Sequence, residues 1–204
     1  VFSALEVVPL LVVGFEAYSR AKHEGLHDWQ KAYRWPFMFF SSVLVWNLIG
    51  AGLFGFLINP PLALYYMQGL NTTATHAHGA LFGVYGMLGL GLILFCMRGL
   101  TDPARWNNKL LAISFWCLNV GLAMMVFLSL LPQGLWQAYL SFTHDYAYAR
   151  SAEVIQGPVM ETLVWARVPG DIVFGIGAFA FAIFVAQAFW STRKARTVSL
   201  DPVN

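Results

Sequence analysis

The stretch NTTATHAHGALFG, residues 71–83, places two histidines, His76 and His78, one residue apart at the start of a strongly apolar segment. A polar ring in such a segment is costly to bury unless it gains a partner. On a helix, residues i and i+2 lie about 200° apart, so the two imidazoles point to opposite faces. A single metal ion would instead suit residues i and i+4. The pair therefore indicates two ligands on two sides of one helix.

The apolar character of this segment extends along the whole chain of 204 residues, which is 58% hydrophobic and only 11% charged. Soluble domains carry about 25% charged residues. Five segments are long enough to cross ~30 Å of hydrocarbon, which takes roughly 20 residues each. The sequence predicts an all-α, polytopic transmembrane helix bundle embedded in a lipid bilayer, with spans at 1–18, 35–58, 75–98, 108–131 and 169–191.

The first span opens at residue 1 with no polar flank and no charged leader. We therefore expect residues 1–204 to be the C-terminal transmembrane part of a longer polypeptide, with further helices upstream. The net charge of +2 and the lack of a basic patch with interleaved aromatics argue against a nucleic-acid partner.

The distribution of Lys and Arg predicts the orientation of the spans. Ten of these residues fall in the segments 19–34, 98–109 and 192–204, whereas 59–74 holds none and 132–168 holds two. Cytoplasmic loops carry the excess of positive charge. The sequence thus predicts an outward-facing loop at 59–74, a long outward-facing loop at 132–168 and a cytoplasmic C-terminus.

His76 and His78 have two interpretations. Neutral imidazole is a common metal ligand and an axial ligand of haem iron, so each ring could bind one iron. Alternatively, the rings lie near the membrane surface and bond to neighbouring backbone. The small residues around them leave room for a flat macrocycle, but Gly79 and Gly83 also fit a close helix-packing motif.

Glu6 is the second candidate site residue, because it lies within the apolar run VFSALEVVPLL. A carboxyl inside a span would carry protons or ligate a metal. The alternative is a solvated acid in the first turn of a helix that begins later, which Pro9 would permit. The stretch GAGLFG at 50–55 fits a dinucleotide-binding pattern, but it follows no strand and is better explained by helix packing.

The motifs THAHGALFGVYG, FSALE, WNLIGAGLFGFLINPP and WARVPGDIVF together resemble the catalytic subunit of nitric oxide reductase, a branch of the haem-copper oxidase superfamily. The resemblance covers the whole chain and corresponds to the last five core helices of that family. It implies that His76 ligates the high-spin haem b3 and His78 the low-spin haem b. It also implies that Glu6 lies near a non-haem iron.

The resemblance implies a bacterial inner-membrane enzyme that reduces two NO molecules to N2O and water. The family's other non-haem iron ligands and the second haem b ligand have no counterpart here, so upstream helices must supply them. The segment 144–171 resembles the quinol-dependent form more than the form that uses a cytochrome c-type donor. An oxygen-reducing relative and a non-catalytic di-haem electron-transfer module are the alternatives.

Overall fold

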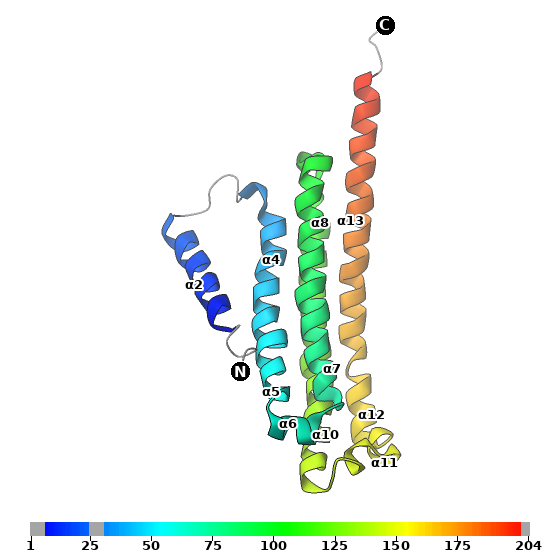
Figure 1. Ribbon diagram of the computed structural model, residues 1–204. Coiled ribbons are helices and arrows are strands. Elements are labelled where there is room, and N and C mark those ends of the chain that lie inside the picture. Colours follow the sequence, from blue (N-terminus) through cyan, green and yellow to red (C-terminus); the bar gives the residue numbers. More distant parts are fainter. Residues whose placement is uncertain (1–6, 25–30, 201–204) are drawn as a thin grey trace.

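The computed structural model of the chain describes residues 7–24 and 31–200, and these residues are almost entirely helical (Figure 1). Within them, four helices are long and apolar enough to cross a membrane: Arg34–Ile58, Asn71–Leu100, Asn108–Thr143 and Pro158–Arg193. They run alternately in opposite directions along one bundle. The chain is therefore a multi-pass, all-α membrane protein, as the sequence predicts, with four such helices in the described residues where the sequence predicts five.

All four long helices are composites of shorter elements. The first is α4 (Arg34–Trp46), η1 (Asn47–Phe54) and α5 (Gly55–Ile58); the second is α7 (Asn71–His78), η2 (Gly79–Gly86) and α8 (Met87–Leu100). The third is α9 (Asn108–Met124), η4 (Met125–Leu130) and α10 (Leu131–Thr143); the fourth joins α12 (Pro158–Trp165) to α13 (Val168–Leu200). Short connecting helices are α6 (Pro61–Met67), η3 (Pro103–Arg105), η5 (Tyr148–Arg150) and α11 (Ala152–Ile155). The segments η1, η2 and η4 are π-helical, a form that is rare and often found at functional sites.

The span predicted at 1–18 begins in residues that lie outside the described ranges. From Val7 the chain forms α2 (Val7–Glu24), which continues past the predicted end at residue 18. Arg20 pairs with Glu16 at 2.7 Å, one helical turn away. The prediction placed the end too early because hydropathy falls there, whereas good helix formers and an i,i+4 ion pair extend the helix into polar sequence.

The predicted end of the fourth span at residue 131 is wrong. The sequence Leu131–Pro132–Gln133–Gly134 does not break the helix, which continues to Thr143. Pro132 follows the π-helical segment η4, where the backbone hydrogen-bond pattern already departs from the α-helix. The outward loop predicted at 132–168 consequently shrinks to a short region of turns and small helices between residues 144 and 157.

Two other predicted breaks are confirmed. The first long helix ends at Ile58 before Asn59-Pro60-Pro61, and the second ends at Leu100 before Thr101-Asp102-Pro103. The start predicted at 169 is too late: α13 begins at Val168, but it joins α12 through a two-residue turn, so the long helix begins at Pro158. Proline disfavours helical conformation in the residue before it, in keeping with the non-helical Pro60 before Pro61 and the extended Asp102 before Pro103.

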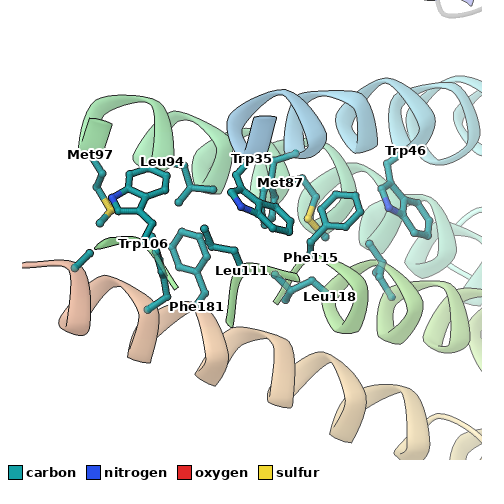
Figure 2. Packing of buried hydrophobic residues seen from close by; sticks show 14 of the residues in the cluster. Trp35, Trp46, Met87, Leu94, Met97, Trp106, Leu111, Phe115, Leu118 and Phe181 are labelled. Atoms are coloured by element: carbon teal, nitrogen blue, oxygen red, sulfur yellow. The ribbon is translucent and has the colours of Figure 1, made fainter. Parts of the chain in front are cut away.

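The core of the bundle is a continuous cluster of large apolar and aromatic side chains from the four long helices (Figure 2). Phe39, Phe115 and Phe181 meet edge to face, with ring centroids 5.3 and 6.1 Å from Phe39. The polar edge of a buried tryptophan is satisfied across helices, since Trp46 Nε1 donates to Asn119 Oδ1 at 3.0 Å. These contacts hold α4, α9 and α13 together.

Glycines bring the helices close together at the level of the π-helical segments. A Cβ atom on Gly50 would lie 2.6 Å from the backbone of Gly79, and one on Gly83 would lie 2.5 Å from Trp46 Cγ. The backbones of η1 and η2 are therefore in direct contact. The interpretation of GAGLFG as a helix-packing sequence is confirmed.

Candidate functional site

The two histidines lie in the last turn of α7, and the helix continues directly into η2. The helix begins at Asn71, four residues earlier than the predicted span at 75. His76 and His78 are therefore held inside a continuous helix rather than at a frayed end. Both side chains are partly buried.

The ring of His76 faces the helix Arg34–Ile58. Its Nδ1 donates to the backbone carbonyl of Gly50 at 2.8 Å. The ring also lies over Gly55, where an added Cβ would approach His76 Cε1 to 3.1 Å. Two glycines of η1 and α5 thus provide the acceptor and the space for this imidazole.

The ring of His78 has different neighbours. Its Nδ1 donates to the carbonyl of Ala74, one turn back in the same helix, at 2.9 Å. It lies 5.4 Å from the ring of Phe82, which in turn contacts Phe174 of α13 with 5.6 Å between centroids. The two histidines therefore face different sides of one helix, as their spacing predicts.

The hydrogen bonds determine which nitrogen of each ring is available to a ligand. A carbonyl oxygen only accepts, so Nδ1 carries the proton in both rings. The neutral imidazole then has a free lone pair on Nε2. Neither Nε2 has a hydrogen-bond partner in the described part of the chain. Metal-bound histidines commonly show this arrangement, in which Nδ1–H bonds to a backbone carbonyl and fixes the ring.

The described residues do not assemble a metal site from protein side chains alone. No group of three His, Cys, Asp or Glu side chains in residues 7–24 and 31–200 is placed to hold an ion. Glu6, the third predicted site residue, lies outside the described residues. An iron at either histidine would take its remaining ligands from a porphyrin or from other parts of the protein.

Gly79 and Gly83 lie against the neighbouring helix rather than beside an open space. Gly79 contacts Gly50, and Gly83 contacts the Trp46 side chain. Of the two explanations that the sequence left open for these glycines, close helix packing is confirmed. Any room for a macrocycle therefore lies on other faces of the helix.

Sequence reasoning missed the residues that hold the start of the histidine helix. Gln133 Oε1 accepts from Asn71 Nδ2 at 2.8 Å, and Gln137 Oε1 accepts from the Asn71 backbone N–H at 2.9 Å. A signal was present, because Ser129, Gln133 and Gln137 recur every four residues in an otherwise apolar segment. This spacing places three polar side chains on one helix face.

An apolar helix bundle with two partly buried, backbone-bonded imidazoles on one helix is an arrangement expected of a haem-binding membrane protein. Residues 1–173 match the family described as cytochrome c and quinol oxidase polypeptide I. The chain belongs to this family of haem-copper oxidase polypeptides, which implies haem cofactors.

A nitric oxide reductase polypeptide of Stutzerimonas stutzeri is a curated relative, 28% identical over 137 residues. The match covers 63% of this chain and 28% of that protein. The chain thus spans little more than a quarter of the length of the relative. This similarity agrees with the resemblance seen in the sequence motifs.

Proposed function

We propose that this chain is the C-terminal transmembrane part of a nitric oxide reductase, in which His76 ligates the high-spin haem b3 and His78 the low-spin haem b. The observation that carries the proposal is the pair of Nδ1–H bonds to the carbonyls of Gly50 and Ala74. Among residues 7–24 and 31–200, they leave both Nε2 atoms without a hydrogen-bond partner, on different sides of one helix. The relative in Stutzerimonas stutzeri supports the choice of activity.

The chain's own residues would orient the cofactors. When bound, haem supplies a redox-active iron that accepts an imidazole as axial ligand. The Gly50 carbonyl holds the His76 ring in one plane and one tautomer, and the Ala74 carbonyl does the same for His78. Because both ligands belong to α7, the helix backbone fixes the separation of the two iron positions. Such a fixed separation of the two ligands would suit cofactors that exchange electrons.

The reaction we propose consumes two NO, two electrons and two protons, and it releases N2O and water. Holding both NO molecules at one metal pair would bring their nitrogens close enough to couple, a proximity effect. We propose that Glu6 lies near the non-haem iron and relays protons to this site. The other iron ligands would come from helices outside residues 1–204.

We propose quinol as the electron donor and the bacterial inner membrane as the location, with the C-terminus in the cytoplasm. The resemblance of segment 144–171 to the quinol-dependent form supports the donor. The charge distribution supports the orientation. Arg34 is the first residue of α4, and Arg98 and Arg193 lie near the C-terminal ends of α8 and α13. These three helix ends lie at the same end of the bundle (Figure 1). Positive charge gathers on the cytoplasmic side.

Isotope-labelled NO given anaerobically to the purified complete polypeptide tests this function. We expect one labelled N2O for every two NO consumed, with a reduced quinol analogue as donor. Faster turnover with reduced cytochrome c would reassign the donor while leaving the reaction intact. Consumption of O2 without N2O formation would contradict the proposal in favour of an oxygen-reducing enzyme. Absence of haem would rule out both.

A further inference from the structure

The first turn of the histidine helix is held by side chains from another helix. Gln137 of α10 accepts the Asn71 backbone N–H at 2.9 Å, and Gln133 accepts the Asn71 side-chain amide at 2.8 Å. The first N–H groups of a helix have no partner within that helix. Leu70, which precedes α7, offers no capping side chain. Gln137 therefore caps α7 from outside, and Gln133 holds the side chain of the same first residue.

Each glutamine is itself fixed at its other end. Gln133 Nε2 donates to Ser129 Oγ at 2.8 Å, and Ser129 Oγ donates to the Leu163 carbonyl at 2.8 Å. Gln137 Nε2 donates to the Ala149 carbonyl at 3.3 Å. Both glutamines are only 5% exposed. A buried amide with both ends bonded tolerates one orientation, because turning it would leave donors and acceptors unpaired.

The backbones of α7 and α10 touch between the two glutamines. A Cβ atom on Gly134 would lie 2.5 Å from the Thr72 backbone nitrogen and 2.9 Å from the Thr72 Cα. Thr72 is buried and donates from its hydroxyl to the Met67 carbonyl at 3.3 Å. The start of α7 is thus fixed by direct backbone contact as well as by the two amides.

The position of Asn71 determines where the imidazoles point. His76 and His78 follow it by five and seven residues, so they lie about 7.5 and 10.5 Å further along the helix axis. A slip of one residue at the start of α7 would turn both rings by about 100°. The Gly50 carbonyl could then no longer accept from His76.

We infer that Gln133 and Gln137 are positioning residues that fix the rotation and axial register of the helix carrying the two haem ligands. This inference rests on the proposed function, since it assigns the glutamines to the orientation of His76 and His78. They touch neither histidine and act through Asn71. Replacing a residue that only packs would change stability alone. Replacing either glutamine would also change the geometry of bound haem.

The test replaces Gln137 with Leu, which keeps a similar volume but removes the acceptor for the Asn71 N–H. Gln137→Glu serves as the conservative variant, because the neutral acid keeps an acceptor oxygen for the Asn71 N–H and an O–H that can donate to the Ala149 carbonyl. Gln187→Leu is the matched control: Gln187 is an exposed glutamine of α13 that accepts from Asn107 at 3.4 Å. The complete polypeptide is purified in each case. The readouts are haem content, the electron paramagnetic resonance of the low-spin haem and the iron–histidine stretch of the high-spin haem.

Gln137→Leu is expected to lower the fraction of haem with the wild-type low-spin signal at least about twofold and to broaden the remainder. Gln137→Glu should restore most of the wild-type signal, and Gln187→Leu should leave it unchanged. If Gln137→Leu does not insert, Ser129→Ala provides a milder change. It removes the partner of Gln133 Nε2 and should shift the same signals in the same direction.

Wild-type spectra in Gln137→Leu, or in Ser129→Ala when the first variant does not insert, would overturn the positioning role. That result differs from failure of the proposed function. A wild-type protein without haem, or a His78→Ala variant that keeps the low-spin signal, would contradict the ligand assignment whatever the glutamine variants show.

Discussion

Replacing Gly50 with Ala should separate the two helices that meet at the histidine pair. The added Cβ would lie 2.6 Å from the Cα and the carbonyl carbon of Gly79, and 3.0 Å from the carbonyl oxygen. Favourable carbon contacts begin near ~3.5 Å, so the helices must move apart by about 1 Å. The obstructing atoms belong to the backbone and cannot rotate away. Overpacking of this kind costs about 1–3 kcal/mol.

The same movement would stretch the 2.8 Å bond from His76 Nδ1 to the Gly50 carbonyl. Loss of that bond adds about 0.5–1.5 kcal/mol. Together, we expect Gly50→Ala to lower the free energy of unfolding by about 1.5–4.5 kcal/mol. It should also reduce the occupancy of the haem assigned to His76.

Thermal unfolding in detergent and quantification of haem measure both effects. Gly89→Ala is the matched control, because Gly89 lies in α8 with no atom within 4 Å of an added Cβ. It should be neutral or stabilise the helix by up to about 1 kcal/mol. If Gly50→Ala unfolds at the same temperature as Gly89→Ala and keeps full haem content, the reasoning from backbone contact is refuted.

Three further predictions concern other parts of the molecule. Trp46→Phe should lower the free energy of unfolding by about 1–3 kcal/mol, since it leaves Asn119 Oδ1 without its 3.0 Å donor; unchanged thermal stability would contradict this. Glu6→Gln should slow NO turnover by about 10²-fold or more with haem content retained, and wild-type turnover would exclude proton transfer by Glu6. In a variant without the natural cysteines, an impermeant thiol reagent added outside should label Gln68→Cys and spare Ala104→Cys; the reverse pattern would invert the proposed topology.

The approximate ranges of the long helices could be predicted from the sequence. The length of an apolar segment and the prolines that follow it are both visible in the local sequence. Asn59-Pro60-Pro61 and Thr101-Asp102-Pro103 end helices where the sequence predicts. Pro132 does not, since the preceding π-helical segment changes the local backbone pattern and the helix continues to Thr143. No local signal in the sequence indicates that π-helical segment. Hydropathy also fails to predict a helix end that lies in polar sequence, such as the C-terminal end of α2.

The candidate site was predictable only in part. The spacing of His76 and His78 reveals that they face opposite sides of one helix. Their hydrogen-bond acceptors do not follow from the spacing: the Gly50 carbonyl is 26 residues away from His76 in sequence, and its approach depends on glycine contacts between helices. The Gln133 contact spans 62 residues in the same way. Such partners depend on tertiary packing. The spacing and hydropathy of one sequence do not predict which helices come into contact.

The central claim is that His76 and His78 bind two different haem irons, and spectra of His76→Ala and His78→Ala in the complete polypeptide test it most directly. His78→Ala should lose the low-spin haem signal and keep a high-spin haem that binds CO. His76→Ala should keep the low-spin signal and lose the axial-histidine signature of the CO-binding haem. Loss of the same haem signal in both variants, with the other haem intact, would contradict the claim.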